Sequence, residues 1–216
     1  MTGTVLAQSN GDANRAFLQA PVFTDAVDYQ SFPAFANCSE ERVQKVKYFA
    51  CRDSRTLYEA ALADAKENGK PLMVIFGFNR CPYCTVLERT VLDPKKPMLT
   101  GHVVRYFSKP ALQSFVTEAA PLEIPVLRLH ARSDHGLKLA DDLGVTEMAQ
   151  ARGWHRVWSP FIIFVNPETG AMASESEWEA EETYCDWPVN IAASLEEIGM
   201  AQKGTPLTER KRCKKG

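Results

Sequence analysis

The sequence predicts an α/β fold in which a central mixed sheet is flanked by helices. Three apolar runs of strand length, at 72–78, 124–131 and 161–166, alternate with segments of helical periodicity. Strands that alternate with helices usually pair in parallel. The turn sequence at 167–170 and the alternating segment at 171–181 indicate instead an antiparallel hairpin at the end of the sheet. The sheet is therefore expected to contain both kinds of pairing.

Helical periodicity begins after Asp53 and recurs along the chain. In the first helix, Ser54 or Thr56 is suited to the N-cap position. A second helix is expected to begin at or beside Cys81, directly after the first apolar run. Further helices are expected within 109–120, 135–145 and 189–202.

The bulk composition is that of an ordinary globular protein. The chain has 216 residues, is 45% hydrophobic and carries a formal net charge of -2, which gives no electrostatic case for a nucleic-acid partner. Its apolar runs are too short to span a membrane, so we expect a soluble protein. We expect a partly irregular N-terminal extension at 1–53, one main domain at 54–202 and a basic C-terminal tail at 203–216.

Two features bear on the cellular compartment. The segment "VLAQ" at 5–8 has small residues at the spacing of a signal-peptidase site. Residues 1–13 have neither a basic segment nor an apolar core, so the chain would be a mature form with a replacement Met1. Cys38 and Cys51 lie in a segment with little periodicity, where a disulfide would add roughly 2–3 kcal/mol of stability. That bond would indicate an oxidising compartment, the periplasm or another part of the cell envelope. Two unrelated thiols and a cytoplasmic location remain the alternative.

The sequence Cys-Pro-Tyr-Cys at 81–84 lies where a strand gives way to a helix. The first turn of a helix offers unpaired N–H groups that favour a thiolate, and Pro82 suits the first helical position. We therefore expect Cys81 to be exposed at the helix entrance and to act as the nucleophile. Cys84 would face the sheet one turn later and act as the resolving thiol. Arg80 would either add positive charge beside Cys81 or be an ordinary solvated charge of the loop.

Metal binding and inert thiols are the competing interpretations of the cysteine pair. Two cysteines at this spacing form half of a zinc site, but the chain has no second such pair, and no two of its four histidines have the spacing of a zinc finger. Neither interpretation accounts for the strand before the pair and the helix after it. We therefore expect a redox pair that needs no metal and no organic cofactor.

The segment "GKPLMVIFGFNRCPYCTVLERTVL" at 69–92 resembles the active-site segment of the thioredoxin superfamily, most closely the thioredoxin-like proteins of bacterial envelopes. The resemblance extends over about 54–200 and implies a thioredoxin-like fold. It also implies that Pro160, in "WSPFIIFVN", is cis and stands against the cysteine pair. Ser159 would then pair through its backbone with an extended substrate, and Arg80, Pro82 and Tyr83 would border the substrate site.

Several positions depart from the family pattern. Ile75 occupies the position of a buried aspartate that serves the resolving thiol in many thioredoxins, and Arg80 replaces a tryptophan. The segment before Pro160 is longer than usual. Its Trp154, His155 and Trp158 would form either a lip beside the active site or a packed cover. The acidic segment at 174–182 is either an edge strand protected by charge or a docking face for a partner.

The predicted function is thiol–disulfide exchange on protein substrates, with a redox partner that resets the pair. A glutaredoxin-like enzyme that depends on glutathione is one alternative. A non-enzymatic binding or chaperone module on a thioredoxin scaffold is another. The direction of electron flow depends on the reduction potential, which the sequence leaves open.

Overall fold

The computed structural model describes residues 22–38, 47–88, 92, 123–151, 153–155, 157, 159–175 and 187–200. Several sequence-based expectations lie outside these residues: the helix at 109–120, most of the acidic segment, Trp158, and the tail at 203–216. Within the described residues, no helix has both the length and the apolar character needed to cross a membrane.

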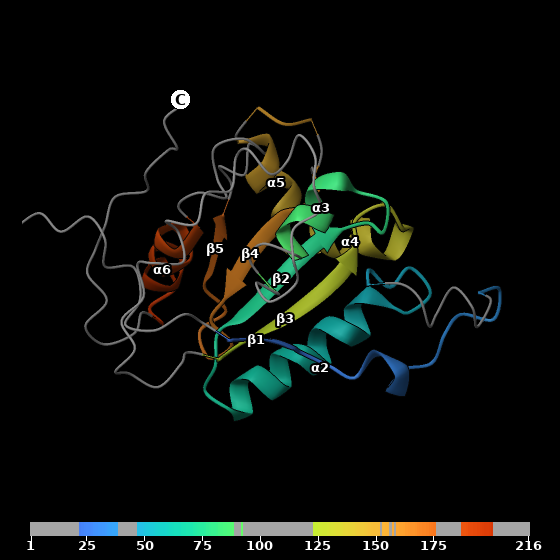
Figure 1. The fold of residues 1–216 in the computed structure, drawn as a ribbon, viewed down its shortest axis with the longest axis horizontal. Helices are drawn as coiled ribbons and strands as arrows, with labels where there is room; N and C mark the ends of the chain where they lie inside the picture. The colour runs from blue at the N-terminus through green and yellow to red at the C-terminus, as the bar shows by residue number, and fades with distance from the viewer. Residues whose placement is uncertain are drawn as a thin grey trace, which may run out of the picture.

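Five strands form one mixed sheet in the order β1-β3-β2-β4-β5 (Figure 1). They are β1 (Val22–Asp25), β2 (Leu72–Gly77), β3 (Glu123–His130), β4 (Phe161–Val165) and β5 (Met172–Glu175). Strand β3 pairs in parallel with β1 and β2, whereas β4 is antiparallel to both β2 and β5. The predicted mixed sheet and its final hairpin are thus confirmed.

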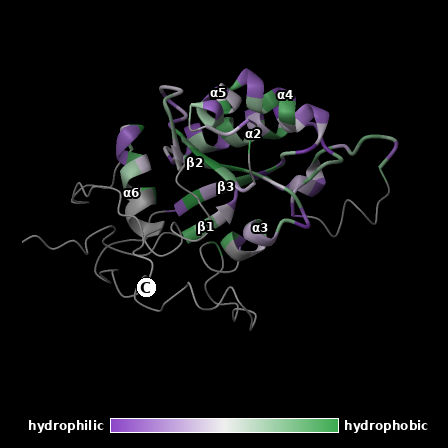
Figure 2. Cartoon of the chain, turned by 90° about the horizontal axis from the view of Figure 1, so that it is seen from above, coloured by the Kyte–Doolittle hydropathy of each residue, from purple (hydrophilic) through white to green (hydrophobic). Residues whose placement is uncertain are grey.

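Helices cover both faces of the sheet (Figure 2). One face carries α2 (Ser54–Glu67), α4 (Asp134–Asp142) and α5 (Val145–Gln150); the other carries α3 (Pro82–Leu87) and α6 (Trp187–Glu197). Side chains of β2 alternate between the two cores, because successive residues of a strand point to opposite faces. Met73 and Ile75 join the core that contains the cysteine pair, while Leu72, Val74 and Phe76 join the other.

The first helix is capped one residue earlier than expected. Asp53, rather than Ser54 or Thr56, is the N-cap of α2, and its carboxylate accepts a hydrogen bond from the backbone N–H of Thr56 at 2.8 Å. Ser54 is instead buried, and its hydroxyl pairs with Nδ1 of His135 on α4 at 2.8 Å. A carboxylate at the N-cap satisfies an otherwise unpaired helix donor.

One strand and one α-helix were not expected from the sequence, and neither was the short 3-10 helix η1 (Tyr29–Ser31). The region at 1–53 contributes β1 to the sheet, although only four residues form it and most of them are exposed. The segment after Gly144 begins with the short helix α5, where we expected a loop; Gly144 itself has a positive φ of 72°. All three elements are too short to produce a recognisable period.

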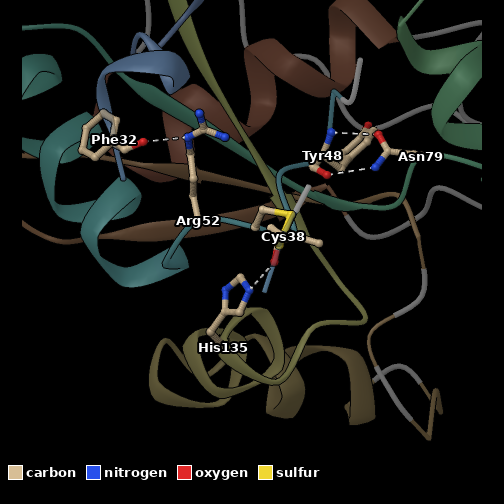
Figure 3. The surroundings of a disulfide bond; sticks show 8 residues. Phe32, Cys38, Tyr48, Arg52, Asn79 and His135 are labelled. Atoms are coloured by element: carbon tan, nitrogen blue, oxygen red, sulfur yellow. Dashed lines mark hydrogen bonds between the residues drawn. A yellow bond between two sulfur atoms is a disulfide. The ribbon is translucent and has the colours of Figure 1, made fainter. Parts of the chain in front are cut away.

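The disulfide between Cys38 and Cys51 is present (Figure 3). It lies in a segment that is tied to the domain at several points. The backbone N–H of Phe35 donates to the carbonyl of Cys51 at 2.8 Å, and Nε2 of His135 lies 3.1 Å from the carbonyl of Ala50. Tyr48, three residues before Cys51, is bonded through its backbone to Asn79 beside the cysteine pair (Figure 3).

Candidate active site

The pair Cys81–Cys84 lies at the junction of β2 and α3, as predicted. Strand β2 ends at Gly77, and a turn closes when the N–H of Cys81 donates to the carbonyl of Phe78 at 3.0 Å. Pro82 is the first residue of α3, and the carbonyl of Cys81 accepts the first helical hydrogen bond, from Thr85 at 3.1 Å. Cys81 therefore precedes the helix, with its sulfur among the free N–H groups of the first turn.

Hydrogen-bond donors of the first turn of α3 converge on the sulfur of Cys81. A hydrogen bond from the Cys84 thiol is the main reason that the pKa of Cys81 falls to about 7, and backbone N–H groups of Cys84 and Tyr83 contribute. The N–H of Cys84 lies 3.2 Å from Sγ of Cys81. The positive charge that contributes is that of Arg132, after β3, whereas we expected Arg80 to supply it.

The pKa of Cys84 is shifted in the opposite direction. Its hydrogen bond to Cys81 and its burial raise its pKa far above that of an ordinary thiol. One sulfur is thus held ready to ionise, while the other keeps its proton. The two thiols differ in the direction that the predicted roles of nucleophile and resolving thiol require.

Cys81 is buried, with only 2% of its surface exposed, contrary to the expectation of an exposed nucleophile. The segment before β4 covers it: in the thiol form, Sγ of Cys81 lies 3.4 Å from the carbonyl oxygen of Ser159 and can donate to it. The peptide bond between Ser159 and Pro160 is cis, as the resemblance implied. Because Ser159 is remote in sequence, the local pattern around Cys81 could not reveal this cover.

Three other predicted site residues are neighbours of the pair in sequence. Pro82, Tyr83 and Arg80 are exposed on the surface beside Cys81, where a substrate could meet them. Of the segment before Pro160, Trp154 is half-buried and packs edge-on against Phe161, with ring centroids 5.9 Å apart. That contact favours a packed cover over a lip at Trp154.

Sequence reasoning missed a buried polar group behind Cys84. Glu88 is buried and receives hydrogen bonds from Nε of Arg128 at 2.6 Å, from Lys47 at 2.9 Å and from the hydroxyl of Tyr48 at 3.4 Å. Two signals could have indicated it. Glu88 follows Cys84 by four residues, which places both on one helix face, and Arg128 is the charged residue within the run 124–129, whose other residues are apolar.

The negative charge of Glu88 is balanced by the positive charges of Arg128 and Lys47. Burial alone would raise the pKa of Glu88, but the hydrogen bonds and positive charges of Arg128 and Lys47 outweigh it and lower the pKa. Burial likewise disfavours the charge on Arg128, and Glu88 outweighs it, so the pKa of Arg128 rises. Arg128 also pairs with Asp25 of β1. Glu88 is therefore a carboxylate in the folded protein.

Tyr48 is fixed between this ion pair and the cysteines. The side-chain carbonyl of Asn79 accepts from the N–H of Tyr48 at 3.0 Å, and the Asn79 amide donates to the Tyr48 carbonyl at 2.9 Å. Gly77 makes room for the ring, because a Cβ there would lie 2.3 Å from a ring carbon of Tyr48. Tyr48 packs in the same core cluster as Cys81 and Cys84.

The described residues contain no group of three or more His, Cys, Asp or Glu side chains that could hold a metal ion. The chemistry available at this site is that of two thiols with unequal pKa values, a nearby phenol and a buried carboxylate.

Residues 53–104 match the family model described as thioredoxin-like. Together with the mixed sheet and its flanking helices, the match shows the thioredoxin-like fold that the sequence predicted. Among solved structures, the chain is similar to the disulphide isomerase from Xylella fastidiosa Temecula1, with 20% identity and a TM-score of 0.39 over 60% of this chain and 78% of that chain. No curated protein matches the chain.

Proposed function

We propose that this thioredoxin-like protein catalyses thiol–disulfide exchange on protein substrates through Cys81 and Cys84. The thiolate of Cys81 attacks one sulfur of a substrate disulfide, and the other substrate sulfur leaves as a thiolate. Cys84 then loses its proton and attacks Sγ of Cys81, which releases the second substrate sulfur and leaves a Cys81–Cys84 disulfide. Two electrons pass from the pair to the substrate, and the reverse sequence oxidises a substrate dithiol.

The observation that carries this proposal is the asymmetry of the two thiols. The pKa of Cys81 is about 7, and that of Cys84 is raised. A thiolate available near neutral pH is what the first attack needs. A protonated second thiol does not compete with it, and its hydrogen bond to Cys81 supports the first thiolate. An inert pair of core thiols would gain nothing from such an arrangement.

Substrate binding is proposed to use the surface around Cys81. The carbonyl of Ser159 faces the nucleophile at 3.4 Å and would be free to pair with an extended substrate once the Cys81 thiol is consumed. Exposed Tyr83 would supply apolar contact on the other side. Replacing Tyr83 with alanine is expected to raise KM for a protein disulfide more than KM for a small aromatic disulfide. Equal effects on both would contradict a role in protein binding.

Insulin reduction tests the proposed activity. The wild type should reduce insulin disulfides in the presence of a chemical reductant, and the variant Cys81→Ser should not. The variant Cys84→Ser should accumulate a mixed disulfide between Cys81 and insulin, which is visible by mass spectrometry. Cys185→Ser, a cysteine outside the described residues, is the matched control and should retain activity. Equal reduction by wild type and Cys81→Ser would refute the proposal, and a strict requirement for glutathione would favour the glutaredoxin-like alternative.

The Cys38–Cys51 disulfide supports an extracytoplasmic location, because structural disulfides persist mainly in oxidising compartments. Fractionation of cells that produce the native protein should therefore find it in the periplasm or cell envelope. Recovery in the cytoplasm with Cys38 and Cys51 reduced would overturn this assignment and leave the proposed exchange chemistry intact.

A further inference from the structure

Behind the resolving cysteine, a tyrosine hydroxyl is bonded to a buried carboxylate. The hydroxyl of Tyr48 donates to Oε1 of Glu88 at 3.4 Å, and Tyr48 packs in the same core cluster as Cys84, where it contributes to the pKa of that thiol. All three groups are sealed from solvent, with 2% of Tyr48, 4% of Glu88 and 1% of Cys84 exposed. Bulk water therefore has little access to the Cys84 proton.

Several contacts hold the Tyr48 hydroxyl in place. Two hydrogen bonds with Asn79 fix the backbone of Tyr48, and the absent side chain at Gly77 lets its ring lie against the end of β2. Glu88 is held by Arg128 and Lys47, so its carboxylate cannot turn away. A side chain that only filled the core would need neither the hydroxyl nor a charged partner for it.

In the resolving step the Cys84 thiol needs a proton acceptor, and Tyr48 with Glu88 can serve as one. Cys84 must lose its proton as its sulfur attacks, yet burial raises its pKa. Ile75, which occupies the position of the aspartate that serves this thiol in many thioredoxins, cannot accept a proton. The polar groups near Cys84 are Tyr48, which precedes α2, and Glu88, which follows Cys84 by one helical turn. The ionisable groups around it and around Glu88 are Cys81, Tyr48, Lys47, Arg128, Asp25, Tyr29 and, beyond Cys81, Arg132.

We propose that Tyr48 and Glu88 form a proton relay for the resolving cysteine. This inference rests on the proposed function, because it concerns the second step of exchange. As Cys84 attacks Sγ of Cys81, its thiol proton passes to the oxygen of Tyr48, and the hydroxyl proton of Tyr48 passes to Oε1 of Glu88. The bond between Cys81 and the substrate sulfur breaks, and that sulfur leaves with the bonding electron pair. Protonated Glu88 returns its proton to solvent on the side of Lys47, which is exposed.

A coloured aromatic disulfide, dithiobis(nitrobenzoate), separates the two steps in one stopped-flow experiment. Attack by Cys81 releases one nitrothiophenolate anion and leaves a mixed disulfide; attack by Cys84 on that mixed disulfide releases the second anion. The double variant Cys81→Ser/Cys84→Ser gives the background from Cys185 and Cys213. The rates of the two phases then report the nucleophile and the resolving thiol separately.

The variant Tyr48→Phe keeps the packed ring and removes only the hydroxyl. It should slow the second phase at least about tenfold, since a positioned acid or base typically contributes more than that, and it should leave the first phase within about twofold. Tyr58→Phe, a buried tyrosine in the other core cluster, is the matched control and should change neither phase. Glu88→Gln should slow the second phase similarly, whereas Glu123→Gln, at an exposed ion pair with Lys70, should not.

The pH profile distinguishes a relay from a purely structural role. Without the relay, resolution depends on hydroxide, so the second phase in Tyr48→Phe should rise about tenfold per pH unit. The wild type should show a shallower dependence, because its own carboxylate accepts the proton. A second phase in Tyr48→Phe with the wild-type rate and slope would overturn the relay and leave the proposed function standing. A wild type without any second phase would overturn both.

Discussion

The low pKa of Cys81 depends mainly on a single hydrogen bond from Cys84, so removing that bond should raise the pKa. The thiol of Cys84 is the largest contributor to that low pKa of about 7. In the variant Cys84→Ala this donor is lost, while the backbone N–H groups and Arg132 remain. We therefore expect the pKa of Cys81 to rise in Cys84→Ala. In Cys84→Ser, whose hydroxyl can still donate, the rise should be smaller.

The size of the effect follows from ordinary energetics. A hydrogen bond to a charged group contributes about 1.5–3 kcal/mol, and one pKa unit corresponds to about 1.4 kcal/mol, so the rise should be about one to two units. A thiol with a pKa of about 7 is about half ionised at pH 7, against about 3% for an ordinary cysteine. The lower pKa also weakens the thiolate as a nucleophile, by about fivefold. The net rate advantage at pH 7 is therefore only about threefold.

The sharper measurement is consequently the pH at which reactivity appears. Carbamidomethylation of Cys81, followed by mass spectrometry of its peptide between pH 5 and 10, gives a rate midpoint that does not depend on how accessible the sulfur is. The wild-type rate should level off above a midpoint near 7, and the midpoint of Cys84→Ala should move to higher pH. A wild-type midpoint at or above about 8.5, the value of an ordinary thiol, would refute the reasoning. So would an unchanged midpoint in Cys84→Ala.

Three further predictions concern stability and local charge. Replacing both Cys38 and Cys51 with alanine should lower the free energy of unfolding by about 3 kcal/mol in the chain-entropy model, since the bond spans 13 positions; urea denaturation measures this, and a loss below about 1 kcal/mol would contradict it. Gly77→Ala should destabilise the protein by roughly 1–3 kcal/mol because the new Cβ would clash with the ring of Tyr48; an unchanged urea midpoint would show that the ring moves freely. Arg132→Met should raise the pKa of the nucleophilic thiol slightly. Because Arg132 is exposed, high salt should abolish the difference from wild type.

The cysteine junction was predictable because it is encoded locally. An apolar run, a turn, two cysteines one helical turn apart and a proline at the first helical position occupy consecutive residues from 72 to 87. Each of these choices acts through neighbours in the chain, so no knowledge of the tertiary fold is needed. The parallel pairing of β2 with β3 followed from the helices expected between strands, and the antiparallel pairing of β4 with β5 followed from the tight turn that joins them.

The surroundings of the junction were not predictable in this way. The carbonyl that covers Cys81 belongs to Ser159, 78 residues away, and Tyr48 meets Glu88 across 40 residues. The expectation that Cys81 is exposed was wrong because helix position says nothing about what a remote segment lays over it. A charged residue among apolar ones, such as Arg128 in the run 124–129, indicates a buried partner but does not identify that partner.

The ion pairs of Glu88 explain how one site could keep Cys84 protonated at rest and still assist its attack. A carboxylate that Arg128 and Lys47 stabilise has a lowered pKa and is a weak base. It therefore does not remove the proton of Cys84 in the resting dithiol, where that proton supports the thiolate of Cys81. Once Cys81 is bound to substrate, this thiolate no longer exists, and the acidity of the Cys84 thiol increases as its sulfur forms a bond. Proton transfer through Tyr48 then becomes favourable only while Cys84 attacks, so the same weak base that leaves the first step undisturbed would accelerate the second.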